Sequence, residues 1–125
     1  MLIGLISILS SNKAYAKTTT NSLSECESPS NCVLIDWKVN DVTKTYQEAL
    51  KIIEQMPRTK IVEIQNSYIH AEITSKIMHY VDDFEIVPIT DKSVIQIRSE
   101  SRVGNGDFGV NRKRIINFLN ELPKD

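Results

Sequence analysis

The chain has 125 residues, of which 41% are hydrophobic and 25% are charged, and its formal net charge at pH 7 is -1. This length fits one domain with a modest core, and the composition excludes a disordered or fibrous protein. A net charge near zero also argues against a dedicated nucleic-acid binder, because such proteins carry an excess of Lys and Arg.

Residues 1–16 have the layout of a secretory signal peptide. Leu2 to Leu9 are almost wholly apolar, and Ala14-Tyr15-Ala16 follows as a small-residue cleavage site. The apolar run is too short to span a bilayer. We therefore expect cleavage after Ala16, export to the periplasm or beyond, and no transmembrane span in the mature chain. No Lys or Arg precedes the apolar run, so two alternatives are a start further upstream and a cytosolic protein with an apolar N-terminus.

Residues 17–39 are expected to form a flexible arm, because their first part is rich in Thr, Ser and Asn. Cys26 and Cys32 are the only cysteines. In an oxidising compartment this close pair would form a disulfide, whereas two free thiols are expected if the protein is not exported. The pair cannot supply a structural zinc site with four cysteine or histidine ligands, and its spacing is not that of a redox motif.

Residues 40–125 predict a single α+β domain. Asn40 or Asp41 can cap a helix that Pro57 ends. Its apolar positions have helical spacing: Val42, Tyr46, Ala49, Leu50, Ile53 and Met56. A second helix is predicted near the C-terminus by Ile115, Phe118, Leu119 and Leu122.

Four strands are predicted between the helices, because the hydrophobic period changes to two. Residues 60–65 and 68–74 would turn at Asn66-Ser67, and residues 80–89 and 93–99 would turn at Asp91-Lys92. The expected neighbours are Ile64 with Ile69, Val62 with Ala71, Glu63 with His70, Ile86 with Ile97, and Glu85 with Arg98. The prediction is a four-stranded antiparallel meander with two helices packed on one face, in the order α-β-β-β-β-α.

The polar face of this sheet collects the first candidate site. It would hold Glu63, His70, Glu72 and Glu85, together with Asp83, Gln96 and Arg98. A histidine beside carboxylates can perform acid–base chemistry or hold a metal. The alternative is a solvated sheet face with cross-strand ion pairs, which is the usual arrangement in antiparallel sheets. No spacing here is diagnostic of a metal site.

The second candidate site is the segment from Arg98 to Arg114, which links the last strand to the last helix. Its candidate ligands for an anion are the arginines Arg98, Arg102, Arg112 and Arg114. Arg102 with Arg112 is the better clamp, because Arg112 and Arg114 point to different sides of a helix.

Four residues of the same segment are expected to build the turn itself: Gly104, Gly106, Asp107 and Asn111. Glycines permit positive φ, and Asp107 or Asn111 can cap the helix. The alternative to an anion site is a purely structural turn, in which the arginines pair with Glu85, Glu100 or strand-end carbonyls.

The stretch "RSESRVGNGDFGVNRKR" resembles the closing signature of the family catalogued as domain of unknown function 1499. Shorter matches lie upstream at Asn31-Cys32-Val33, Met56-Pro57-Arg58 and 80–85, so the resemblance covers about Cys26 to Leu122. Glu100 and Asn105-Gly106 depart from the family pattern. The family has no agreed function, so the resemblance implies a single domain and adds no activity.

Two classes of function remain. The first is a non-enzymatic module of the cell envelope that binds an anionic lipid headgroup, a glycan acid or the carboxylates of a partner protein. The second is a small hydrolase or isomerase that uses His70 with Glu63 or Glu72. The sequence has no nucleophile elbow, no metal-ligand spacing and no cofactor fingerprint, which favours a binding protein without metal or cofactor. The sequence does not fix the oligomeric state.

Overall fold

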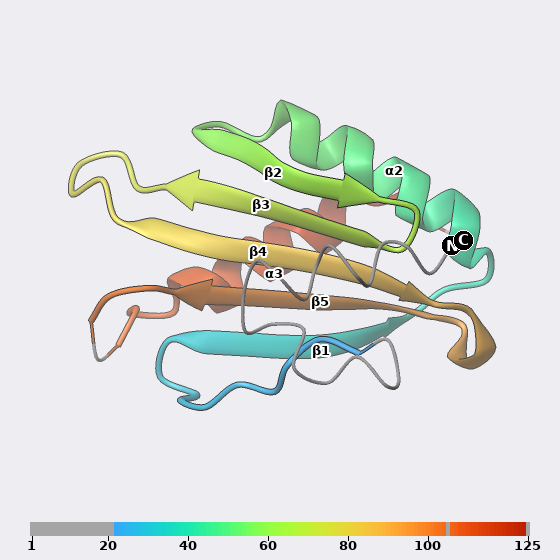
Figure 1. Cartoon of the computed structure of the whole chain (residues 1–125), viewed down its shortest axis with the longest axis horizontal. Coiled ribbons are helices and arrows are strands. Elements are labelled where there is room, and N and C mark those ends of the chain that lie inside the picture. The colour runs from blue at the N-terminus through green and yellow to red at the C-terminus, as the bar shows by residue number, and fades with distance from the viewer. Residues whose placement is uncertain (1–21, 105, 125) are drawn as a thin grey trace.

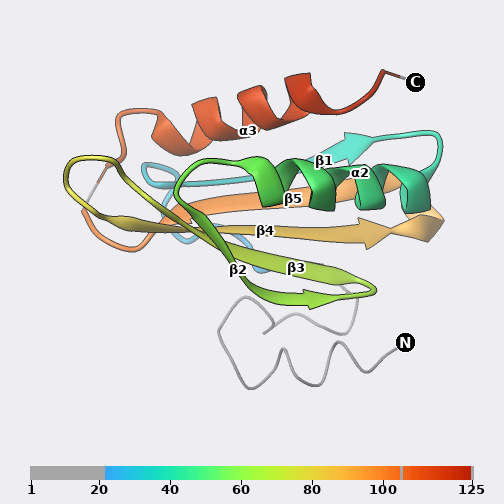
Figure 2. The same cartoon turned by 90° about the horizontal axis from the view of Figure 1, so that it is seen from above.

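The structure is a computed structural model that describes residues 22–104 and 106–124. The predicted signal peptide, residues 1–16, lies outside the described residues, as does its cleavage site. The elements, in chain order, are β1 (Cys32–Lys38), α2 (Val42–Gln55), β2 (Thr59–Gln65), β3 (Tyr68–Thr74), β4 (Val81–Ile89), the short 3-10 helix η3 (Thr90–Lys92), β5 (Val94–Ser101) and α3 (Val110–Glu121). Both α-helices lie on the same face of one sheet (Figures 1 and 2).

The sheet has five antiparallel strands in the order β1-β5-β4-β3-β2. The predicted α+β class is confirmed, but the prediction of four strands in the order α-β-β-β-β-α is wrong. The additional strand is β1, which lies in the segment predicted to be an arm and pairs with β5. Its first half, CVLI, lacks a clean alternation because apolar side chains lie on both sides of it: Val33 and Ile35 pack toward the helices, and Leu34 packs on the opposite side.

Helix α2 begins and ends as the sequence predicts. The side chain of Asp41 accepts a hydrogen bond from the backbone N–H of Lys44 at 3.0 Å, which satisfies one free amide of the first turn. The helix ends before Pro57, which cannot continue it.

The predicted strand registers are largely confirmed. Ile64 pairs with Ile69, Glu63 with His70, Ile86 with Ile97, and Glu85 with Arg98. The expected Val62–Ala71 pair is wrong: Ile61 opposes Ala71, because an irregularity of the pairing between Ile61 and Glu63 leaves Val62 unpaired.

The main core lies between the sheet and the two helices. Its most completely buried members include Ala49, Ile53, Phe84, Ile95 and Ile97. The rings of Phe84 on β4 and Phe118 on α3 meet edge to face, with centroids 5.2 Å apart, so α3 is fixed over the centre of the sheet.

A second apolar cluster lies on the opposite face of the sheet, which we call the open face. It contains Leu23, Tyr68, Val87, Ile89 and Val94, with Leu34 packed against it. The arm places Leu23 there, and the Leu23 N–H donates to Oε1 of Gln96 at 2.6 Å. A Cys26–Cys32 disulfide ties the arm to the start of β1. The open face is therefore partly covered by the chain's own arm.

Candidate functional site

The polar residues predicted to share the open face form two connected groups. In the first, Glu85 lies between Tyr68 and Arg98: Tyr68 Oη donates to Glu85 Oε2 at 2.5 Å, and Arg98 Nη1 lies 3.3 Å from Glu85 Oε1. The same Arg98 nitrogen lies 2.9 Å from Glu100 Oε1, and Arg98 Nε donates to the Ser24 carbonyl. Glu85 and Arg98 are almost completely buried.

The second group is centred on Asp83. His70 Nε2 lies 2.6 Å from Asp83 Oδ1, and the Arg102 guanidinium contacts both oxygens of Asp83 at 2.9 Å. Arg102 also reaches Glu72 at 2.6 Å. Glu63 stands opposite His70 in the strand register, but its carboxylate accepts a hydrogen bond from the Gln65 side chain at 2.7 Å.

Burial and charge shift the protonation of these groups in different directions. Burial raises the pKa of Glu85 to about 7, even though Arg98 and His70 favour its charged form. Burial would lower the pKa of His70, but the hydrogen bond to Asp83 and the nearby carboxylates raise it. The pKa of Asp83 is lowered, because the bonds from Arg102 and His70 outweigh the effect of its burial.

The open-face residues are engaged with one another. The side chain of His70 is 8% exposed and its Nε2 is bonded to Asp83, so a substrate cannot reach that nitrogen without displacing the pair. Among the described residues, no three or more His, Cys, Asp or Glu side chains are grouped so that they could hold a metal ion.

The structure divides the four predicted anion ligands between the two faces of the sheet. Arg98 and Arg102 lie on the open face, where carboxylates contact them. Arg114 lies on the helix side, where Nη2 contacts Asp82 at 2.9 Å and Nη1 donates to Ser99 and Asn111. Arg112 is exposed in the first turn of α3. Arg102 and Arg112 are thus not brought together as a clamp.

The predicted turn residues lie at the start of α3. Asp107 accepts hydrogen bonds from the backbone N–H groups of Gly109 and Asn111, at 2.8 and 3.0 Å. The fully buried Asn111 side chain accepts from Ser99 and donates to the carbonyl oxygen of Asn31, which connects the helix to β5 and to the start of β1.

Backbone conformation in this turn differs from residue to residue. Gly104 has a φ of 91°, whereas Gly106 has no positive φ. Two further residues adopt positive φ that the sequence analysis did not single out, Phe108 at 54° and Gly109 at 79°.

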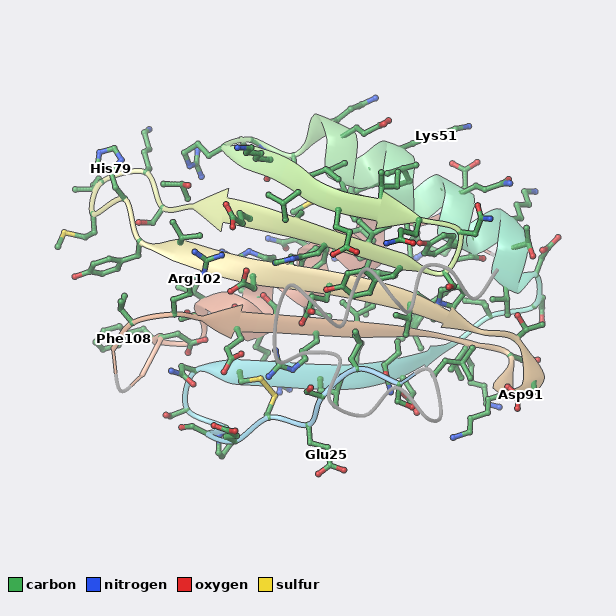
Figure 3. All side chains as sticks on the ribbon, viewed as in Figure 1. Glu25, Lys51, His79, Asp91, Arg102 and Phe108 are labelled. Atoms are coloured by element: carbon green, nitrogen blue, oxygen red, sulfur yellow. A yellow bond between two sulfur atoms is a disulfide. The ribbon has the colours of Figure 1, made fainter. Side chains whose placement is uncertain are left out.

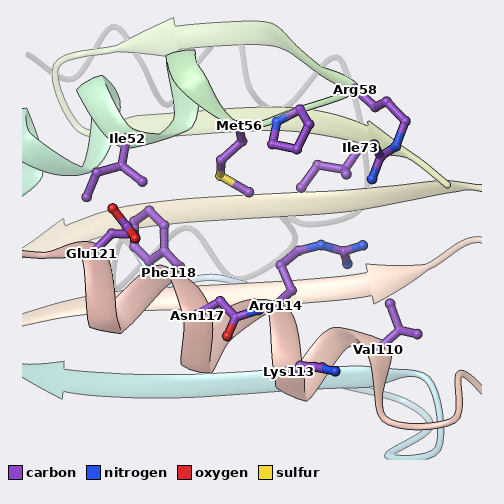
Figure 4. Close-up of a pocket in the computed structure, with 11 residues that line it drawn as sticks. Ile52, Met56, Arg58, Ile73, Val110, Lys113, Arg114, Asn117, Phe118 and Glu121 are labelled. Atoms are coloured by element: carbon purple, nitrogen blue, oxygen red, sulfur yellow. The ribbon is translucent and has the colours of Figure 1, made fainter. Parts of the chain in front are cut away.

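A groove that the sequence analysis missed lies between the C-terminal end of α2 and the length of α3 (Figure 4). We call it the helix groove. Its volume is about 380 Å³, within the range of roughly 300–1,000 Å³ that small-molecule sites have. Its apolar lining comes from both helices, from the segment that follows α2 and from β3: Ile52, Met56, Pro57, Ile73, Val110 and Phe118.

The charged residues of the helix groove are unevenly placed. Arg58 and Arg114 lie toward one end of it, with Lys113 nearby on α3, and Glu121 lies toward the other end beside Ile52 (Figure 4). Arg58 Nε donates to the Thr74 carbonyl at 2.9 Å, which holds this side chain across the end of β3. The groove therefore combines an apolar lining with a cationic end.

A family model matches residues 12–122, which is most of the chain and includes every helix and strand described above. Its description is "protein of unknown function (DUF1499)". The chain belongs to the DUF1499 family. The resemblance stated from the sequence is thereby confirmed, and the DUF1499 match includes both the open-face residues and the helix groove. No curated protein matches the chain.

Within the described part of this DUF1499 protein, neither helix is long and apolar enough to cross a membrane.

Proposed function

We propose that the protein is a non-enzymatic binding module that holds an anionic amphiphile, a molecule with an acidic head and an apolar chain, in the helix groove. The observation that carries this proposal is the combination of an apolar lining and a cationic end in one cavity of about 380 Å³. Sites for small molecules are mostly apolar, with a few polar groups that fix the ligand's orientation. The acidic head would lie near Arg58, Lys113 and Arg114, and the chain would extend toward Ile52.

This proposal keeps the anionic ligand expected from the sequence but moves its site away from the arginine-rich turn. Arg98 and Arg102 already neutralise carboxylates on the open face, so they have little remaining charge to offer a ligand. Arg114 also contacts Asp82, and its role would be shared with Lys113 and Arg58. In the described part of the chain, neither Lys113 nor Arg58 forms an ion pair.

The alternative, a small hydrolase or isomerase at His70, has less support. A general base must reach the proton that it removes, and His70 is buried with its Nε2 occupied by Asp83.

The test is a titration with dodecanoate and, for comparison, with dodecanol, which has the same chain length and a neutral head. We expect dodecanoate to bind more tightly. Lys113→Glu should weaken dodecanoate binding about tenfold, the equivalent of ~1.4 kcal/mol. Lys44→Glu is the matched control, because Lys44 is also an exposed lysine near a helix start but does not line the groove.

A second pair of variants tests the location of the apolar chain. Asn117 is exposed on α3 and lines the groove, whereas Asn120 is exposed on the same helix and does not. Asn117→Trp should fill the groove and abolish binding of both ligands, and Asn120→Trp should leave binding unchanged. Binding that is equal in the two tryptophan variants would refute the site.

We also propose that the protein acts outside the cytoplasm. The Cys26–Cys32 disulfide supports this, since such bonds persist in oxidising compartments. Protein recovered from the periplasm should begin at Lys17 and have a mass two hydrogens below that of the reduced chain. A mass that retains residues 1–16, or thiols that react without a reductant, would contradict export.

A further inference from the structure

We infer that one end of the molecule is a docking surface for an anionic membrane. We call this end the apolar tip. It consists of the exposed hydrophobic side chains of two loops: Ile77, Met78, Tyr80, Val103 and Phe108. The inference goes beyond ligand binding in the helix groove and does not depend on it.

The sheet topology brings the two loops together. Residues 75–80 connect β3 to β4, and residues 102–104 and 106–109 belong to the connection between β5 and α3. In the β4–β5 register Asp82 pairs with Ser101, and the Arg102 N–H donates to the Val81 carbonyl at 3.3 Å. Both loops therefore leave the sheet at the same end (Figures 1 and 2). Figure 3 labels one residue of each loop, His79 and Phe108, with Arg102 between them.

The backbone holds Phe108 in solvent. Its side chain is fully exposed, although its φ of 54° is one that non-glycine residues rarely adopt. The Asp107 carboxylate fixes this conformation by accepting the N–H groups of Gly109 and Asn111, on the C-terminal side of Phe108. A strained residue that contributes nothing to the core points to a role in recognition.

The second loop also contains a non-glycine residue with positive φ. His79 has a φ of 58°, and Ile77, two residues before it, is 81% exposed. The Ser75 side chain accepts the Tyr80 N–H at 2.8 Å, and the Ser75 N–H donates to the Tyr80 carbonyl, so the loop is closed at its base. Each loop thus presents a large apolar side chain on a supported backbone.

The carboxylates in and directly beside the two loops are all engaged within the chain. Arg102 binds Glu72 and Asp83, Arg114 binds Asp82, Arg98 binds Glu100, and Asp107 accepts backbone amides.

Three other cations near the tip are not compensated in this way. Within the described residues, Lys76, Arg112 and Lys113 form no ion pair, and each is exposed. The tip is therefore flanked by three cations that have no carboxylate partner within the described residues.

This chemistry fits an anionic bilayer better than a flat protein surface. Loops with single projecting aromatic and aliphatic side chains can insert at the boundary between headgroups and acyl chains, while flanking Lys and Arg remain at the headgroups. Anionic lipids attract such basic residues. Val110 and Lys113 line the helix groove next to this end, so docking would place the groove close to the bilayer.

The experiment is co-sedimentation of the whole chain with vesicles of phosphatidylcholine, with and without phosphatidylglycerol. We expect binding to the phosphatidylglycerol vesicles and weaker binding to phosphatidylcholine alone. The combined variant Ile77→Ser with Phe108→Asn should lower the partition coefficient at least about tenfold. Asn is chosen at position 108 because it tolerates positive φ, so the loop keeps its backbone.

The matched control is Ile64→Ser, which changes an exposed isoleucine of β2 near the opposite end of the sheet and should leave vesicle binding unchanged. All variants have the same N-terminus, so a difference in vesicle binding between them is caused by the substituted residues. Asn117→Trp should still bind vesicles, which separates a failure of the groove proposal from a failure of this one. The inference is overturned if the wild type stays in the supernatant or if the tip variant sediments like the wild type. The inference is also overturned if the wild type forms a dimer that the combined variant does not form, while both bind vesicles equally.

Discussion

Tyr68 Oη and Glu85 Oε2 are joined by a 2.5 Å hydrogen bond between neighbouring strands, and both residues are 1% exposed. The bond remains possible when Glu85 is protonated on its other oxygen, so the tyrosine supports a neutral Glu85 as well as a charged one. Burial raises the pKa of Glu85 to about 7, which makes this pair sensitive to pH near neutrality.

The free energy of unfolding should fall as the pH rises from 4.5, the ordinary pKa of Glu85, to about 7. In this window the folded protein holds a proton on Glu85 that the unfolded chain has released, so stability decreases with rising pH. The raised pKa of His70 acts in the same direction as the pH rises further. The expected loss from Glu85 is up to about 3 kcal/mol, measured by urea unfolding across this range.

Glu85→Gln should flatten this pH dependence, because glutamine resembles the protonated carboxyl and does not titrate. Glu48→Gln is the control, since Glu48 pairs with Lys51 on the surface of α2 and should leave the slope unchanged. If the free energy of unfolding of Glu85→Gln changes with pH as much as that of the wild type, another group is responsible for the pH dependence.

Two arginines that look equivalent in the sequence should differ in their effect on stability. Arg98→Met should cost about 1–3 kcal/mol, because it leaves the buried Glu85, the half-buried Glu100 and the Ser24 carbonyl without their hydrogen-bond donor. Arg102→Met should cost at most about 1 kcal/mol, because the Arg102 side chain is 45% exposed and its ion pairs are screened by solvent. Urea unfolding of the two variants at pH 7 measures the difference, and equal losses would contradict the burial argument.

The glycines of the turn should also differ in how much their substitution destabilises the protein. Gly104 and Gly109 have positive φ, so Gly104→Ala and Gly109→Ala should each destabilise the protein by about 1–2 kcal/mol. Gly106→Ala is the control, since an added Cβ would meet nothing closer than the Ser30 carbonyl at 3.9 Å. The three variants are compared by thermal unfolding. If Gly106→Ala is destabilised as much as the other two, the different roles given to these glycines are wrong.

Replacing both cysteines should weaken the fold without abolishing it. The Cys26–Cys32 bridge closes a short loop, so Cys26→Ser with Cys32→Ser should lower the free energy of unfolding by about 2 kcal/mol. Denaturant unfolding of the double variant and of the oxidised wild type provides the comparison. Identical midpoints would mean that the bridge does not stabilise the domain.

Local patterns in the sequence predicted the elements whose boundaries depend on neighbouring residues. Asp41 and Pro57 mark the ends of α2, and alternation gave the register that places Glu85 beside Arg98. The same reasoning missed β1, because the first half of this edge strand has apolar residues on both sides of the sheet and so shows no alternation.

The sites depended on tertiary placement that sequence spacing does not contain. Arg98 and Arg114 belong to one short segment of the sequence. In the structure, Arg98 on β5 lies on the open face, whereas Arg114 on α3 lies on the opposite side of the sheet. The helix groove joins Met56 and Arg58 to residues of α3, about half the chain away, and no local pattern links them. Met56 fits the apolar spacing of the first predicted helix, and Phe118 fits that of the second. Such spacing indicates a buried helix face whether or not a groove lies beside it.

The position of Leu23 has a practical consequence for shortened versions of the protein. Leu23 is 2% exposed and completes the apolar cluster around Tyr68, Val87 and Val94. A truncated chain that starts at Asn40, the predicted domain boundary, would lack this cover and also β1, leaving β5 as an unprotected edge. Such a fragment would expose apolar surface beside unpaired backbone groups, a combination that promotes aggregation during expression. The smallest version that remains in solution should therefore begin before Leu23.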